Sequence, residues 1–118
     1  MSQNNNTSVE ALVNLLEAVR KRPGLYIGPR DDGAIWYLNT FLSGVNATSE
    51  LFGVSWDRFD RDIRGDVLVE RGWQLDSHGP NGIWQVMFDQ GMNMEAIIDE
   101  LLVIEITVLQ RSFRSGTS

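Results

Sequence analysis

The stretch TSVEALVNLLEAVRKRPG, residues 7–24, decides the fold. Thr7 and Glu10 have the spacing of a capping box, in which two side chains satisfy free N–H groups at the start of a helix. Three cations at 20–22 suit the negative end of a helix dipole, and Pro23-Gly24 ends the pattern. Between these signals, apolar residues recur three and four positions apart: Val9, Leu12, Val13, Leu16 and Val19. This periodicity predicts an amphipathic helix that buries one face.

Helical spacing recurs along the rest of the chain and predicts an all-α fold of four or five helices. The further helices are expected at 34–45 with a less regular continuation to 52, at 56–69 after a cap at Ser55, at 83–88, and from a cap at Asn93 through 108. Two alternatives stay open: 83–88 fits a short helix or a strand, and the β-branched run 103–108 also fits a strand near the C-terminus. The short apolar segment 25–28 is expected to lie extended against the core.

The length of 118 residues and the 42% apolar content fit one hydrophobic core, so we expect a single helical domain over residues 7–113. Flexible tails are expected at 1–6 and 114–118, which are polar and lack periodicity. The chain has no cysteine, no apolar run near the roughly 20 residues that span a bilayer, and no secretion signal. The expected localisation is cytoplasmic.

The net charge of −6 is unevenly distributed along the chain. Residues 1–30 contain four cations and two acids, whereas residues 50–105 contain twelve acids and four arginines, a local net charge of −8. Such a field repels nucleic acid and anionic membranes and attracts cationic partners. We therefore expect neither nucleic acid nor a membrane as a partner.

No set of side chains in the sequence forms a recognisable catalytic or metal-binding pattern. His78 is the single histidine; Asp76 and Ser77 are merely its sequence neighbours, and no second histidine or cysteine completes a metal site. The carboxylates of 57–70 alternate with arginines at helical spacing, which favours ion pairs. Asp99-Glu100 is interpreted as the solvated face of the last helix. We expect no enzyme activity, no catalytic residue, no metal and no cofactor.

Residues 16–33, which begin LEAVRKRPGLYIG, resemble the start of the ATPase domain of bacterial DNA gyrase. In that family the next helix contains Glu-x-x-x-Asn, where the Glu is the catalytic base and the Asn binds magnesium. The corresponding residues here are Leu42 and Asn46, and leucine cannot activate water. The resemblance therefore implies no ATP hydrolysis, and it leaves a degenerate nucleotide-binding or gyrase-interacting protein as an alternative.

A second resemblance covers more of the chain. It is to small bacterial immunity proteins encoded near secreted toxin genes, and it rests on Arg-Pro-Gly-hydrophobic-Tyr-hydrophobic-Gly at 22–28, Phe-Leu-x-Gly at 41–44, Gly72-Trp73, and a Leu-rich acidic helix at 96–102. This resemblance implies that the chain binds a toxin from neighbouring cells and blocks it. The motif residues with an expected structural role are Arg22, Pro23, Gly24, Tyr26, Gly28 and Trp73.

We therefore expect a non-enzymatic protein-binding module, an immunity protein whose acidic face contacts a cognate toxin with a cationic surface. The candidate contact residues are Asp57, Asp60, Asp62, Asp66, Glu70, Asp76 and His78. A structural or oligomerising module is a further alternative, with exposed Trp36, Trp56 or Trp84 as its interface. The sequence does not determine the oligomeric state.

Overall fold

The computed structural model describes residues 2–26, 34–52, 61–73 and 82–116. Every regular element within these ranges is helical, so the prediction of an all-α fold is confirmed. The elements are α1 (Ser2–Lys21), α2 (Pro23–Tyr26), α3 (Ala34–Ser49), the 3₁₀ helix η1 (Glu50–Phe52), α4 (Arg61–Glu70), α5 (Ile83–Asp89) and α6 (Met94–Gly116). In these ranges α2 is a single turn of 4 residues, and the other five α-helices have 7 residues or more.

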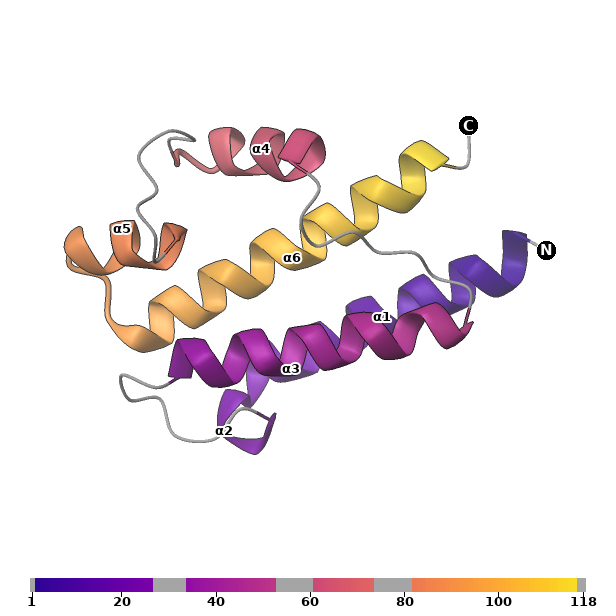
Figure 1. Cartoon of the computed structure of the whole chain (residues 1–118), viewed down its shortest axis with the longest axis horizontal. Coiled ribbons are helices and arrows are strands. Elements are labelled where there is room, and N and C mark those ends of the chain that lie inside the picture. The colour runs from indigo at the N-terminus through magenta and orange to yellow at the C-terminus, as the bar shows by residue number, and fades with distance from the viewer. Residues whose placement is uncertain (1, 27–33, 53–60, 74–81, 117–118) are drawn as a thin grey trace.

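Helix α6 lies in the middle of the molecule (Figure 1). Helices α1 and α3 pack on one side of it, whereas α4 and α5 lie on the other side. Because α1 runs antiparallel to α6, the start of α1 and the end of α6 lie at the same end of the molecule. None of the helices in the described ranges is long and apolar enough to cross a lipid bilayer.

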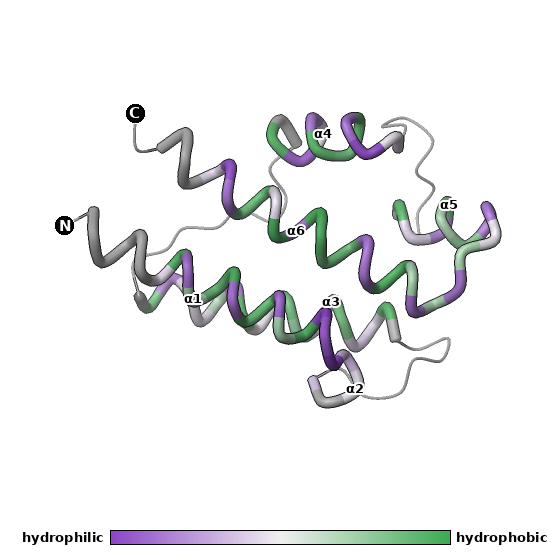
Figure 2. Tube along the Cα trace, turned by 180° about the vertical axis from the view of Figure 1, so that it is seen from behind, coloured by the Kyte–Doolittle hydropathy of each residue, from purple (hydrophilic) through white to green (hydrophobic). Residues whose placement is uncertain are grey.

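Two hydrophobic cores meet on α6. The core shared with α1 and α3, which we call the α1–α3 core, takes four buried side chains from α6: Ile98, Leu102, Ile106 and Leu109. The core shared with α4 and α5, the α4–α5 core, takes three others: Ile97, Ile104 and Val108. Figure 2 shows hydrophobic positions recurring along the length of α6. A helix with apolar residues on two sides is buried on both, which places α6 at the centre.

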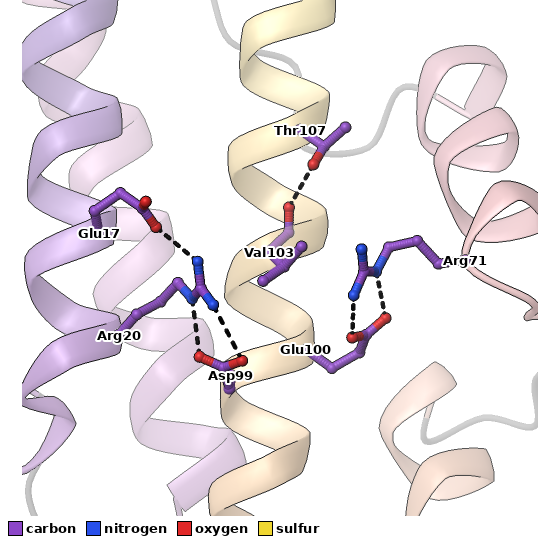
Figure 3. Close-up of polar contacts among 7 residues, drawn as sticks. All are labelled: Glu17, Arg20, Arg71, Asp99, Glu100, Val103 and Thr107. Carbon is purple, nitrogen blue, oxygen red and sulfur yellow. Dashed lines mark hydrogen bonds and ion pairs between the residues drawn. The ribbon is translucent and has the colours of Figure 1, made fainter.

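The alternative of a strand at 103–108 is wrong, because α6 is continuous through this segment. Ile104 and Val108 belong to the α4–α5 core, whereas Ile106 belongs to the α1–α3 core. Residues four apart therefore share a core and residues two apart do not, as helical geometry requires. The hydroxyl of Thr107 also donates a hydrogen bond of 2.8 Å to the carbonyl of Val103, one turn earlier (Figure 3).

Helix α1 buries the face that the sequence predicts. Leu16 and Val19 are fully buried, and three neighbours on the same face pack against the core: Val9, Leu12 and Val13. Helix α3 completes this core with Leu38 and Leu42. The continuation of the α3 helix to 52 is also confirmed, as η1 follows it directly.

The α4–α5 core assembles shorter helices over the opposite side of α6. Val67 and Leu68 of α4 and Met87 of α5 are buried there, together with Ile35 from the start of α3. Segment 83–88 thus adopts the helical alternative. The described part of the helix expected at 56–69 is α4, and residues 56–60 lie outside the described ranges.

The start of α6 follows the predicted cap. The side-chain oxygen of Asn93 accepts a hydrogen bond of 2.8 Å from the N–H of Ala96, three residues later. This side chain satisfies one of the free N–H groups in the first turn of α6. Gly91 follows the end of α5, two residues before Asn93. Its φ of 94° is a backbone conformation that residues with a Cβ atom disfavour.

The prediction of an extended segment at 25–28 is wrong for its described part, because Pro23–Tyr26 forms the helical turn α2. Pro23 ends α1 but also begins α2, since its fixed φ suits the first position of a helix. Helical backbone also extends over residues 2–6 and 114–116, beyond the expected domain limits of 7–113. The flexibility of these tails stays a prediction.

Leu102→Ala tests the dependence of the fold on α6. Leu102 is fully buried in the α1–α3 core, so the truncation should lower the free energy of unfolding by about 2–5 kcal/mol. Urea denaturation followed by circular dichroism measures the change. Gln110→Ala, at an exposed position of the same helix, should change the stability by less than about 0.5 kcal/mol. Equal effects of the two substitutions would contradict the central position of α6.

Candidate partner-binding surface

The structure describes two of the candidate contact residues fully. Asp66 and Glu70 are exposed on α4. Asp62 belongs to α4 by its backbone, but its side chain is not among those described. The remaining candidates lie outside the described ranges: Asp57, Asp60, Asp76 and His78. The described part of the predicted acidic surface therefore lies on α4.

Asp66, Val69 and Glu70 share the outward side of α4, and we call this set the α4 face. Spacings of three and four residues place them together on one side of the helix. Val69 is 58% exposed, while its neighbours Val67 and Leu68 are buried in the α4–α5 core. The α4 face thus combines an exposed apolar side chain with two carboxylates.

Arg111 of α6 reaches the edge of the α4 face. Its guanidinium donates two hydrogen bonds, of 2.6 and 2.5 Å, to the two carboxylate oxygens of Glu70. These bonds hold the pKa of Glu70 below its ordinary value and raise the pKa of Arg111, to which the nearby charge of Asp66 also contributes. One guanidinium beside two carboxylates leaves the α4 face with a net negative charge.

A buried ion pair holds α4 on α6. Two guanidinium nitrogens of Arg64 donate to the two carboxylate oxygens of Glu105, with Nη2 at 3.1 Å from Oε1. The side chains are only 19% and 8% exposed. Removing one partner of such a pair costs about 3–5 kcal/mol, because the other charge stays buried without a counterion. The pair therefore fixes the position of α4.

The segment after α4 makes a second attachment to α6. Gly72, with φ of 89°, turns the chain so that the N–H of Trp73 donates to the carbonyl of Leu68 at 2.8 Å, which is a Schellman motif. Arg71 then donates two bonds of 2.6 Å to the carboxylate of Glu100 (Figure 3), and the indole of Trp73 donates another of 3.0 Å. Arg71 is the main cause of the lowered pKa of Glu100, and Trp73 adds to it.

Helix α6 is also attached to α1, through Asp99 (Figure 3). Arg20 donates to the two oxygens of Asp99 at 2.8 and 3.3 Å, and to Glu17 at 2.9 Å. These bonds raise the pKa of Arg20, with Asp99 as the largest cause. The Asp99 side chain is still 49% exposed, so the interpretation of a solvated face holds for Asp99. It is wrong for Glu100, whose side chain is 15% exposed and bonded to Arg71 and Trp73.

The motif at 22–28 has a partly packed and partly exposed structure. Arg22 and Gly24 are exposed, Pro23 is half-buried, and Gly28 lies outside the described ranges. Tyr26 is 41% exposed, and its ring meets the ring of Phe41 edge-on, with centroids 6.2 Å apart and an interplanar angle of 68°. This contact packs α2 against α3.

The tryptophans named as possible interfaces differ in exposure. Trp36 of α3 is 75% exposed. Trp84 of α5 is half-buried, and its ring meets that of Phe88 edge-on at a centroid distance of 6.5 Å. Trp56 lies outside the described ranges. Among these three, Trp36 is the one that the structure describes as widely open to solvent.

Two hollows bear on small-molecule binding. One hollow, of about 190 Å³, lies between α3, α4, α5 and α6 beside the Arg64–Glu105 pair. The buried Nε of Arg64, which lines it, has no hydrogen-bond partner among the described residues. This volume is below the roughly 300–1,000 Å³ of typical ligand pockets. The other is an open, mainly apolar groove of about 450 Å³ between α1 and α3. Across the described ranges, no group of three or more metal-ligating side chains gathers.

The two positions that the gyrase resemblance singles out, Leu42 and Asn46, are buried and half-buried. Leu42 is 2% exposed and belongs to the α1–α3 core, and the side-chain oxygen of Asn46 is buried without a hydrogen-bond partner among the described residues. Leu42 therefore serves packing at the place where that family has its catalytic base. Comparisons with protein-family models, with curated proteins and with solved structures find no match to this chain.

Glu100→Gln tests the attachment of α4 to α6 through its pH dependence. The pKa of Glu100 is lowered from its ordinary value of about 4.5 in the folded protein, so ionisation of this group stabilises the fold above that pH. This stabilisation is lost as the pH falls through the lower, folded-state pKa. The variant should therefore be less stable at pH 7, by about 1–2 kcal/mol, and should lose less stability on acidification.

Urea denaturation between pH 7 and pH 3 measures both effects. Glu10→Gln, which changes an exposed carboxylate on α1, is the matched control and should keep the pH dependence of the wild type. If Glu100→Gln lost as much stability on acidification as the wild type, the pairing with Arg71 would not contribute to the fold.

Proposed function

We propose that the chain is a non-enzymatic protein-binding module, an immunity protein that neutralises a bacterial toxin by covering a cationic surface of it. The observation that supports this proposal best is the α4 face. Val69, 58% exposed, stands next to the carboxylates of Asp66 and Glu70. Protein interfaces centre on an apolar side chain that becomes buried and surround it with polar groups.

The attachments of α4 favour tight binding. Arg64–Glu105, Arg71–Glu100 and Arg111–Glu70 connect α4 and its end to α6. A surface that is held in place before it meets its partner loses less conformational entropy on binding. Short helices are unstable in isolation, so these ion pairs and the α4–α5 core also maintain the shape of the α4 face.

The charge distribution favours a cationic partner. The residues from 50 to 105 have a net charge of −8, and α4 lies within this segment. A negative surface accelerates the encounter with a positive one and repels nucleic acid. A toxin with a cationic surface, such as a nuclease, fits this complementarity, and the cytoplasm is the compartment where such a toxin would be blocked.

The nucleotide-binding alternative has less support. It depends on Asn46, whose side-chain oxygen is buried, and the corresponding catalytic position is the core residue Leu42. Packing of Leu42 between α1, α3 and α6 accounts for this residue without a nucleotide. A titration calorimetry experiment with millimolar ATP and magnesium distinguishes the two functions, since the immunity protein should give no binding heat.

Asp66→Arg and Val69→Ala separate the charge and the apolar contact of the α4 face. The probe is the purified protein encoded by the gene next to that of this chain, with binding kinetics measured by surface plasmon resonance at low and high salt. Asp66→Arg should lower the association rate by about tenfold at low salt and reduce its salt dependence. Val69→Ala should raise the dissociation rate by about five- to tenfold.

Glu10→Arg is the control, because it makes the same charge reversal on α1, on the other side of α6. It should change the association rate by less than about twofold. Equal effects of Asp66→Arg and Glu10→Arg on the association rate would show that only the net charge matters. That result would refute the role of the α4 face as the binding surface. A neighbouring gene product that kills cells whether or not this chain is present would refute the immunity function.

A further inference from the structure

Helix α3 presents an exposed surface without charge, on the side of the molecule opposite α4 (Figure 1). Its 16 residues, AIWYLNTFLSGVNATS, include no Asp, Glu, Lys or Arg, in a chain with 22% charged residues. Trp36 is 75% and Tyr37 49% exposed, and Leu51 in the adjoining η1 is 82% exposed. An exposed helix that contacted only water would be expected to have charged residues on its outer side.

Gly44 lies at the centre of this surface. Glycine weakens a helix interior relative to other residues, so its presence in mid-helix calls for a reason. The packing of the described residues does not supply one, since a Cβ atom added at Gly44 meets none of their atoms within 4 Å. Thr40 and Thr48, one turn before and one turn after, are also small and exposed. Small residues in this arrangement let the backbone of a second helix approach closely.

An apolar groove runs beside these small residues. It has a volume of about 450 Å³ and lies between α1 and α3. Its walls are formed by Leu12 and Leu15 of α1, and by residues of α3 that include Phe41 and Val45. We call this groove, together with the exposed side of α3 and η1, the α3 face. The α3 face thus combines room for another helix with apolar side chains to cover.

The spacing of the residues on the α3 face points to its occupant. Tyr37 and Leu51 each lie seven residues from Gly44, and Thr40 and Thr48 each lie four residues from it. Two antiparallel copies of the helix, related by a two-fold axis at Gly44, would place each Tyr37 on the Leu51 of the other copy. The same axis would set small Thr40 against small Thr48. The surface is complementary to itself, as a two-fold interface requires.

We propose that the chain forms a homodimer through the α3 face, with the two α3 helices antiparallel and crossing at Gly44. This inference does not depend on the toxin-binding function. Each copy has a net charge of −6, so two copies repel each other wherever charged surfaces meet. Contact through α3 keeps this repulsion small. The α3 helix has no charge to bring close to its counterpart.

The available area sets the strength of the dimer. At 1.5 Å per residue α3 is about 24 Å long, and two neighbouring helices make a face about 20 Å wide. Two such faces of about 480 Å² each bury about 960 Å², which is below the roughly 1,200 Å² of stable specific interfaces and in the range of weak, transient complexes. We therefore expect a dissociation constant in the micromolar range and rapid exchange between monomer and dimer.

Gly44→Glu tests the interface. A Cβ atom at this position meets no described residue within 4 Å, and glutamate favours a helix more than glycine does, so the fold should be preserved. Burying this charge against its counterpart should raise the dimer dissociation constant by at least about 100-fold. Analytical ultracentrifugation between about 5 and 500 µM protein measures the constant for the wild type and the variant.

Val69→Glu is the matched control, since it adds the same charge to an exposed position on the opposite side of α6. It should dimerise like the wild type. A wild-type chain that remains monomeric at the highest concentration would overturn the proposal and leave the α3 face to a different protein. Equal dissociation constants for Gly44→Glu and the wild type would also overturn it, by placing the interface elsewhere.

A cross-linking experiment remains decisive if Gly44→Glu fails to fold. The chain has no cysteine, so Gly44→Cys introduces a single thiol. In the proposed dimer the two thiols face each other; diamide accepts their two hydrogen atoms as the S–S bond forms between the chains. Gly44→Cys should give mainly disulfide-linked dimer on a non-reducing gel, whereas Val69→Cys should give little. Equal cross-linking of the two variants would refute the Gly44 crossing.

Discussion

Side chains of α6 complete two hydrophobic cores, and the rest of the structure depends on this shared helix. Leu102 and Ile104, two residues apart, belong to different cores. Helices α4 and α5, with 10 and 7 residues, are too short to be stable in water by themselves. They are ordered because they pack on α6, which α1 and α3 hold from the other side. Both halves of the molecule therefore share one source of stability.

Arginine–carboxylate pairs then set the orientation of the surrounding helices on α6. Hydrophobic contacts have no direction, whereas a guanidinium fork fits a carboxylate in few geometries. Arg20 of α1, Arg64 of α4, and Arg71 just after α4 each donate two hydrogen bonds to a carboxylate of α6. These acids of α6 are thus engaged within the molecule. Asp66 and Glu70 of α4 keep their carboxylates at the surface, where Glu70 is paired with Arg111.

The two surfaces of the molecule differ in character and lie on opposite sides of α6. The α4 face is acidic around an exposed valine, which suits a cationic protein. On the α3 face, helix α3 itself has no charged residue and exposes aromatic side chains, which suits a close helical contact, and the exposed Glu50 of η1 lies beyond its end. Two chains joined through α3 would leave both α4 faces open to solvent. The proposed self-association and the proposed toxin binding are therefore compatible in one assembly.

The sequence by itself determined most of the helices, because their signals are local: the periodicity of Leu16 and Val19 and the cap at Asn93 involve residues within one or two turns. It left 83–88 and 103–108 open between helix and strand, and the structure has both as helices packed in the cores. It misjudged Pro23, since proline both ends one helix and starts the next. Only the tertiary structure decided which carboxylates are paired internally and which face solvent. The paired residues lie far apart in the chain, 79 positions for Arg20 and Asp99, and 29 for Arg71 and Glu100. No local spacing reports such pairs, because they form when packing on α6 brings distant helices together.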